Sequence, residues 1–160
     1  MTLPERKKLR LEGYNYSQNG VYFITICAKN KEKLFGEVVG DGVPDVPRVE
    51  LSPIGETVDK YILSIEEKYD YITIEKYVIM PNHIHLLIMV YNCDNAITSG
   101  ANSAIPRLIS TLKRFVNKEV GIDVWQRSYH DHIIRNQSDY DEIWQYIDEN
   151  PLKWKLDCYY

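Results

Sequence analysis

Two histidines stand two residues apart in a strongly apolar stretch of the chain. His83 and His85 flank Ile84 within the run from Val78 to Val90. Residues i and i+2 of a β-strand project from the same face, so both imidazoles would point to one side of a sheet. Two neighbouring imidazole nitrogens supply two of the ligands that a divalent metal ion needs. The pair therefore predicts a metal site, and its structural alternative is two buried histidines that only hydrogen-bond their neighbours.

Other familiar metal and histidine sites fit the chain poorly. The three cysteines, Cys27, Cys93 and Cys158, lie far apart and form no CxxC pair, so a zinc finger is not indicated. A histidine-triad nucleotide hydrolase would place a third histidine at the next same-face position, which is Leu87. The odd, scattered set of cysteines favours reduced thiols over a disulfide framework.

Length and composition predict one domain, residues 1–160, with a real hydrophobic core. The chain has 160 residues, 44% of them hydrophobic, and no internal repeat. No apolar run approaches the roughly 20 residues that span a membrane, and the charged amino terminus is not followed by a signal-peptide core. We therefore expect a cytoplasmic protein.

Basic charge is concentrated in two parts of a chain whose net charge is −4. The first is the amino terminus, with Arg6, Lys7, Lys8 and Arg10. The second lies between residues 103 and 135, where six basic residues outnumber three acids; the basic residues are Arg107, Lys113, Arg114, Lys118, Arg127 and Arg135. Local potential governs phosphate contact more than total charge, so a basic groove remains compatible with an acidic chain. A solvated surface of mixed charge is the alternative.

The first half of the chain predicts strands around one helix. Residues 21–27 follow an Asn-Gly turn and are rich in β-branched and aromatic residues, and residues 33–39 are expected to pair with them. A Gly- and Pro-rich loop, 40–47, precedes a short strand near Val49. Ser52 and Pro53 then start a helix that continues toward Lys68.

The second half predicts a hairpin, two helices and one further strand. Residues 71–79 form a strand that returns through Pro81 and Asn82 into the histidine strand, and 103–120 form a helix with one apolar stripe. Residues 124–135 read as a strand, and a last helix starts with a cap at Ser138 and is limited by Pro151. This order predicts an α+β fold with a ferredoxin-like antiparallel sheet, helices packed on it and a small extra hairpin.

The last helix carries two polar side chains that would complete the site. Tyr146 falls outside the apolar stripe of this helix, and Asn150 lies one turn further on the same flank. An asparagine oxygen would be a third, harder metal ligand, and the tyrosine hydroxyl would then lie near a metal-polarised phosphate. From spacing alone, packing at the helix edge is the alternative for Tyr146.

Several ordered motifs resemble those of one protein family. They are Met80-Pro81-Asn82-His83-Ile84-His85 and the runs 124–127, 132–136 and 146–154, and the similarity extends back to 10–16 and 21–26. In these motifs the chain resembles the REP-associated tyrosine transposases, which are single-tyrosine HUH transposases of the IS200-like superfamily. The similarity covers nearly the whole sequence.

The resemblance implies a metal-dependent nuclease and strand transferase that acts on single-stranded DNA near a hairpin. His83, His85 and Asn150 match the positions that hold Mg²⁺ or Mn²⁺, although the third ligand varies within the family. Tyr146 matches the tyrosine that attacks the scissile phosphorus and forms a 5′-phosphotyrosine. Relatives differ in oligomeric state; we expect a monomer, with a homodimer as the alternative.

Basic residues outside the site are expected to contact DNA phosphates. Arg127 and Arg135 match family motifs, whereas composition alone suggests the others: Arg6, Lys7, Lys8, Arg10, Lys113 and Arg114. His130 and His132 are further donors beside the site if their strand neighbours the histidine pair.

Two other functions remain compatible with these residues. One is a noncatalytic regulator that binds DNA hairpins with the same fold. The other is a metal phosphodiesterase that uses the histidine pair and a water nucleophile, so that Tyr146 would be dispensable.

Overall fold

An antiparallel four-stranded sheet forms the centre of the protein. The computed structural model describes residues 14, 16, 18–40, 46–91 and 103–156. The strand order is β4-β5-β1-β6, from β1 (Gly20–Cys27), β4 (Ile72–Met80), β5 (His83–Val90) and β6 (His130–Ile133). The turn at Pro81 and Asn82 joins β4 to β5, as the sequence predicts. Together with the helices, the sheet confirms the predicted α+β class.

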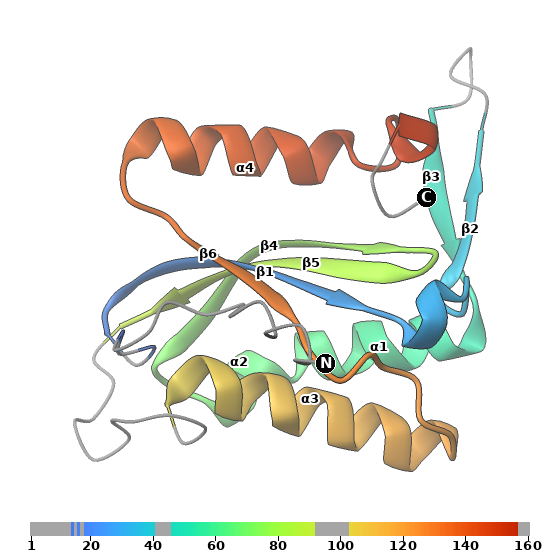
Figure 1. Ribbon diagram of the computed structural model, residues 1–160, viewed down its shortest axis with the longest axis horizontal. Coiled ribbons are helices and arrows are strands. Elements are labelled where there is room, and N and C mark those ends of the chain that lie inside the picture. The colour runs from blue at the N-terminus through green and yellow to red at the C-terminus, as the bar shows by residue number, and fades with distance from the viewer. Residues whose placement is uncertain (1–13, 15, 17, 41–45, 92–102, 157–160) are drawn as a thin grey trace, which may run out of the picture.

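Helices cover both faces of this sheet, as Figure 1 shows. α1 (Pro53–Leu63), α2 (Ile65–Lys68) and α3 (Ala104–Val120) lie on one side, and α4 (Gln137–Glu149) lies on the other. The main core forms beneath the first side, where alternate residues of the central strands meet the apolar stripes of α1 and α3; its members include Ile24, Ile84, Leu86, Val58, Leu108 and Ile109. Among the described helices, none is long and apolar enough to cross a membrane.

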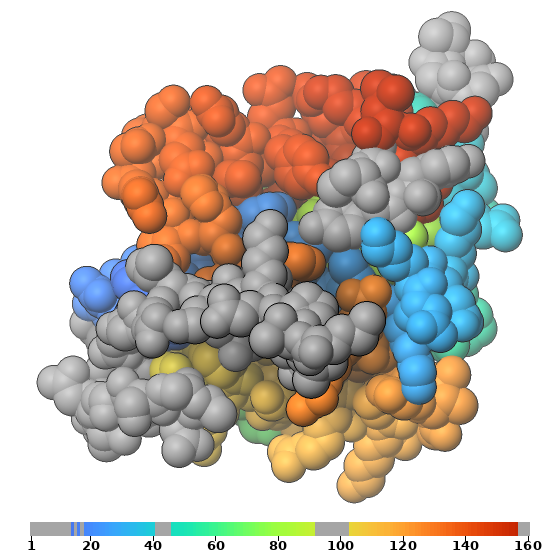
Figure 2. All heavy atoms as spheres, viewed as in Figure 1, coloured from blue at the N-terminus to red at the C-terminus, as the bar shows by residue number. Residues whose placement is uncertain are grey.

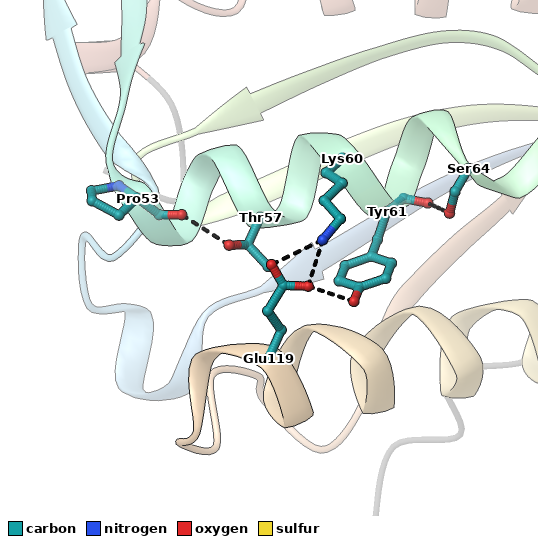
Figure 3. A network of polar contacts seen from close by, with 6 residues as sticks. All are labelled: Pro53, Thr57, Lys60, Tyr61, Ser64 and Glu119. Carbon is teal, nitrogen blue, oxygen red and sulfur yellow. Dashed lines mark hydrogen bonds and ion pairs between the residues drawn. The ribbon is translucent and has the colours of Figure 1, made fainter.

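The helix expected from Pro53 to Lys68 is broken at Ser64. The Ser64 hydroxyl donates to the Tyr61 carbonyl at 2.8 Å, in competition with helical backbone bonding. Figure 3 also shows how α1 is held to α3: the Glu119 carboxylate accepts from Lys60 Nζ at 2.7 Å and from the Tyr61 hydroxyl. These groups are exposed, so we attribute only a small stabilisation to them.

One predicted strand pairing is wrong. β2 (Gly36–Val39) pairs with β3 (Arg48–Leu51) in a separate two-stranded sheet, and neither strand pairs with β1. Both edges of β1 are already occupied, one by β5 and the other by β6. The chain leaves β1 through a short 3₁₀ turn, η1 (Lys29–Lys31), in which Asn30 and Lys31 adopt positive φ. The expected extra hairpin is therefore β2–β3.

The strand predicted over 124–135 is much shorter. Only His130–Ile133 pairs along β1, while Trp125 makes a single isolated bridge to Ala28. Lys113 Nζ donates to the carbonyls of Gln126 at 2.7 Å and Arg127 at 3.4 Å, which holds this segment as a loop. Local residue patterns do not predict this long-range contact.

The start of the last helix also differs slightly from the prediction. Asn136 rather than Ser138 is the N-cap of α4, and its Oδ1 accepts from the Asp139 amide at 2.9 Å. The helix ends at Glu149, just before Pro151, as expected. Cys27 is buried, whereas Cys93 and Cys158 lie outside the described residues, so the expectation of reduced thiols stays a prediction.

A glycine fixes the contact between α1 and the β2–β3 hairpin. A Cβ added at Gly55 would lie 2.0 Å from the Phe35 carbonyl oxygen, a backbone atom. We expect Gly55→Ala to lower the free energy of unfolding by about 1–3 kcal/mol, because the close approach outweighs the better helix propensity of alanine. Denaturant unfolding measures this change. Gly20→Ala is the matched control, because its Cβ would meet nothing within 4 Å; equal stability of the two variants would contradict the prediction.

Candidate metal and nucleophile site

The two histidines converge on one point at the buried centre of the sheet. His83 and His85 lie on β5, the strand between β4 and β1, and their side chains are 0% and 1% exposed. Their Nε2 atoms are 3.1 Å apart. With metal–nitrogen bonds of about 2.1 Å, two ligands at a right angle would be about 3 Å apart. The spacing therefore suits two neighbouring positions in one coordination shell.

Hydrogen bonds on the far side of each ring orient the two Nε2 atoms toward each other. Asn82 Nδ2 donates to the Lys31 carbonyl at 3.4 Å, which identifies Asn82 Oδ1 as the acceptor of the 2.7 Å bond from His83 Nδ1. A proton on Nδ1 leaves the lone pair of His83 on Nε2. His85 Nδ1 lies 2.8 Å from Thr25 Oγ1, which accepts when that nitrogen carries the proton. Such outer partners orient metal-binding imidazoles.

The environment of His85 favours its neutral form. Burial lowers the pKa of His85 well below its usual value, and the charge of neighbouring His83 lowers it further. A neutral imidazole has the lone pair that a metal requires. His85 therefore stays competent as a ligand at pH values where an ordinary histidine is protonated.

Asn150 provides a buried oxygen with no hydrogen-bond partner in the described structure. Its side chain is 2% exposed, its Nδ2 donates to the Tyr146 carbonyl at 3.1 Å, and its Oδ1 accepts no hydrogen bond there. A buried carbonyl oxygen without a partner is costly unless something else coordinates it. Within the described ranges, no three His, Cys, Asp or Glu side chains gather as a metal site. Two imidazole nitrogens and one amide oxygen are the donors in this region that could hold a divalent metal ion.

Tyr146 contacts the histidine pair within the same chain. Its ring lies 5.2 Å from the His85 ring and 6.0 Å from the Phe23 ring, in edge-to-face arrangements. The side chain is 37% exposed, so it touches the buried histidine and still faces solvent. Four residues after Asn150, the Trp154 ring stacks on the His83 ring, with 6.0 Å between the ring centres. These two contacts place the end of α4 over the histidines.

Polar contacts with β4 hold α4 in this position. Lys76 Nζ forms a 2.5 Å ion pair with Asp148 and lies 4.1 Å from the centre of the Trp144 ring. The Tyr140 hydroxyl donates to Glu75 at 3.0 Å. The outward flank of the helix is thus tied to the sheet edge, which directs the Tyr146 flank toward β5 and β1.

His130 and His132 share the sheet face of the histidine pair but lie two strands away. In the β1–β6 register His130 is opposite Thr25 and His132 is opposite Phe23. The strand of His130 and His132 therefore does not adjoin the strand of the histidine pair, because β1 lies between β6 and β5. His132 Nε2 bonds the Asp139 carboxylate at 2.8 Å, and this bond lowers the pKa of Asp139. His132 thus ties β6 to the first turn of α4.

Comparison with known proteins assigns the family. The profile of the family described as "Transposase IS200 like" matches residues 17–150. The chain belongs to this family. This transposase is 34% identical to an uncharacterized protein of Haemophilus influenzae. The alignment covers 97% of the present chain and 93% of the Haemophilus protein. The match confirms the resemblance that the sequence motifs indicate.

A solved structure shows the same fold. The structure of a REP-associated tyrosine transposase bound to a REP hairpin superposes with a TM-score of 0.64 and 19% identity, over 95% of this chain and 74% of that one. A putative transposase from Deinococcus radiodurans has 17% identity and a TM-score of 0.45, over 90% of this chain and 97% of the other. At this identity the first superposition supports the fold alone.

Four of the basic residues expected to contact DNA are described, and they lie on different parts of the fold. Lys113 bonds loop carbonyls, which gives it a structural role in holding 126–128. Arg127 is exposed beside a hollow of about 580 Å³ that Lys29 and Lys113 also line. Arg114 is exposed on α3 with its guanidinium 5.4 Å from the Phe115 ring, and Arg135 is exposed before α4. The four amino-terminal residues, Arg6, Lys7, Lys8 and Arg10, lie outside the described residues.

Sequence reasoning missed the residues that orient the site. Thr25 and Asn82 hold the histidines, Trp154 packs on His83, and Lys76 anchors α4. Thr25 had a weak signal, since it is a polar residue in the middle of an apolar strand. Asn82 directly precedes His83 within the Met80–His85 motif, whereas Trp154 and Lys76 act through contacts between elements that are distant in sequence.

Removing the Thr25 hydroxyl tests whether this group orients His85 for metal binding. We expect Thr25→Val to reduce Mn²⁺ affinity about 10- to 100-fold, because His85 loses the partner of its Nδ1 while the shape of the side chain is kept. Isothermal titration calorimetry with Mn²⁺ measures the change. Thr25→Ser, which keeps the hydroxyl, is expected to bind Mn²⁺ nearly as well as the wild type. Unchanged affinity in Thr25→Val would rule out this role.

Proposed function

We propose that the chain is a metal-dependent single-stranded DNA endonuclease and strand transferase that acts at hairpin DNA with Tyr146 as nucleophile. The observation that carries the proposal is the contact of Tyr146 with His85, whose Nε2 lies 3.1 Å from that of His83. A nucleophile and a two-imidazole ligand pair thus lie side by side. Family membership independently indicates a transposase, a class that cuts and rejoins DNA.

The residues of the site have separate roles in this reaction. His83, His85 and Asn150 would hold Mg²⁺ or Mn²⁺, which supplies Lewis acidity to a nonbridging phosphate oxygen. A phenol has an ordinary pKa near 10, so Tyr146 must lose its proton to solvent or to a base as it attacks. Tyr146 Oη then bonds to the phosphorus, and the bond from phosphorus to the 3′ oxygen breaks. The products are a 5′-phosphotyrosine and a free 3′-hydroxyl.

The covalent intermediate explains how strands are rejoined without an energy source. The phosphotyrosine ester keeps the energy of the cleaved phosphodiester bond. Attack by a 3′-hydroxyl on the same phosphorus releases Tyr146 and seals a strand. The half-exposed position of Tyr146 suits this exchange, because an incoming hydroxyl needs access to the phosphorus.

Hairpin DNA is the proposed partner, and the monomer is the proposed active form. The solved relative was captured with a REP hairpin, which makes hairpin DNA the first substrate to test. Tyr146 reaches the histidines of its own chain, so the catalytic set needs no second copy. A site complete within one chain supports cleavage in cis.

A labelled-DNA experiment tests the proposal. Wild-type protein is incubated with single-stranded hairpin DNA from its own locus, with Mn²⁺ or with a chelator, and the products are separated on a denaturing gel. We expect a metal-dependent covalent adduct, with the DNA attached at Tyr146 when the digested protein is analysed by mass spectrometry. Cleavage without an adduct would instead indicate a water nucleophile. Binding without cleavage would indicate a regulatory hairpin-binding protein.

A further inference from the structure

A cleft beside the proposed site is formed by two parts of the chain that are distant in sequence. Its volume is about 660 Å³, and it lies between the β2–β3 hairpin and the segment that follows α4. Figures 1 and 2 show this segment, in red, beside the hairpin, in cyan. The lining residues of the cleft include Lys33, Glu37, Leu152, Trp154, Lys155 and Leu156.

The cleft adjoins the histidine site. Pro81 lines it and is followed directly by Asn82 and His83, while Pro151 lines it directly after Asn150. Trp154 belongs to the cleft wall, and its ring stacks on His83 with an interplanar angle of 30°. A strand whose phosphate lies at the histidines would therefore meet this cleft at its next nucleotides.

The chemistry of the walls suits nucleotides. Leu152 and Leu156 are 62% and 86% exposed, which is unusual for leucines placed together at the rim of one cleft. Lys33 Nζ lies 5.8 Å from the centre of the Trp154 ring on one side, and Lys155 adds a second cation. Among these six residues Glu37 is the one acid. Apolar and aromatic surfaces for bases, combined with cations for phosphates, are typical of sites for single-stranded nucleic acid.

We propose that this cleft binds the single-stranded nucleotides that adjoin the scissile phosphate, so that the β2–β3 hairpin and residues 151–156 form a substrate clamp. The inference rests on the proposed function, because it assigns the cleft to the same DNA strand. The volume lies within the range of about 300–1,000 Å³ found for sites that enclose small organic ligands, which leaves room for a short stretch of nucleotides. The clamp also gives the hairpin outside the main sheet a role.

Binding of paired DNA substrates tests the clamp. The probes are fluorescent hairpins with one identical stem, either without an overhang or with a single-stranded extension of mixed sequence at the 5′ or the 3′ end. Fluorescence anisotropy with the full chain gives each affinity. For the wild type we expect one of the two extensions to raise the affinity at least about fivefold.

Two double variants separate the clamp from general charge. Lys155→Glu with Leu156→Glu alters the cleft, while Lys118→Glu with Ile122→Glu makes the same types of change at exposed positions near the end of α3. We expect the first variant to lose the gain in affinity that the extension provides. For the hairpin without an overhang, we expect the two variants to have the same affinity. Lys33→Glu, on the opposite wall, is expected to reduce the same gain.

The outcomes distinguish the clamp from the proposed function. No gain from either extension in the wild type, or an equal gain in both double variants, would overturn the clamp. A wild-type adduct formed alongside either result would leave the proposed function standing. A gain lost only in the cleft variants, without any adduct, would support the binding site and reject the tyrosine mechanism.

Discussion

Tyr146→Phe is expected to abolish formation of the DNA adduct and to reduce strand cleavage by at least about 10³-fold. The variant lacks only the hydroxyl oxygen that would bond to phosphorus. Its ring keeps the edge-to-face contacts with His85 and Phe23, so the fold and the hairpin affinity should remain close to those of the wild type. Denaturing gels measure adduct and cleavage, and anisotropy measures hairpin binding.

Tyr140→Phe is the control for this substitution. Tyr140 lies on the same helix, but its hydroxyl donates to Glu75 on β4 rather than facing the histidines. We expect this variant to keep adduct formation within a few fold of the wild type. Cleavage by Tyr146→Phe at the wild-type rate would reject tyrosine as nucleophile and favour hydrolysis by water.

Loss of one imidazole ligand is the second prediction with a large effect. We expect His85→Ala to weaken Mn²⁺ binding by more than about 100-fold and to abolish the adduct. The remaining imidazole and the Asn150 oxygen would provide only two protein ligands, fewer than a divalent ion usually takes from such a site. Calorimetric titration with Mn²⁺ measures the binding directly, without dependence on DNA.

Chelation of the wild-type protein complements this variant, because His85 is buried and its removal leaves a cavity. A chelator should stop adduct formation, and added Mn²⁺ should restore it only in the wild type. His130→Ala is the matched control, since His130 lies on the same sheet face but is exposed on β6. Full Mn²⁺ affinity in His85→Ala would show that the histidine pair has only a structural role.

The sequence by itself determined the elements that carry chemistry. A two-residue spacing put His83 and His85 on one face of a strand, and a four-residue spacing put Tyr146 and Asn150 on one flank of a helix. Both expectations depend only on local periodicity, and both agree with the structure. The fold class followed from the order of such elements, and the ordered motifs pointed to the family that the comparison confirms.

Tertiary structure decided what periodicity cannot specify, namely which elements lie side by side. Residues 33–39 read as a strand, but their partner is β3, because β5 and β6 occupy both edges of β1. Thr25 became the partner of His85 only through the pairing of β1 with β5, across 60 positions of the chain. Likewise, contacts of Lys76 with Asp148 and Trp144 help to hold α4 against β4, with Tyr146 on the flank that faces His85. Such long-range contacts depend on packing of the whole chain, which the local pattern of residues does not encode.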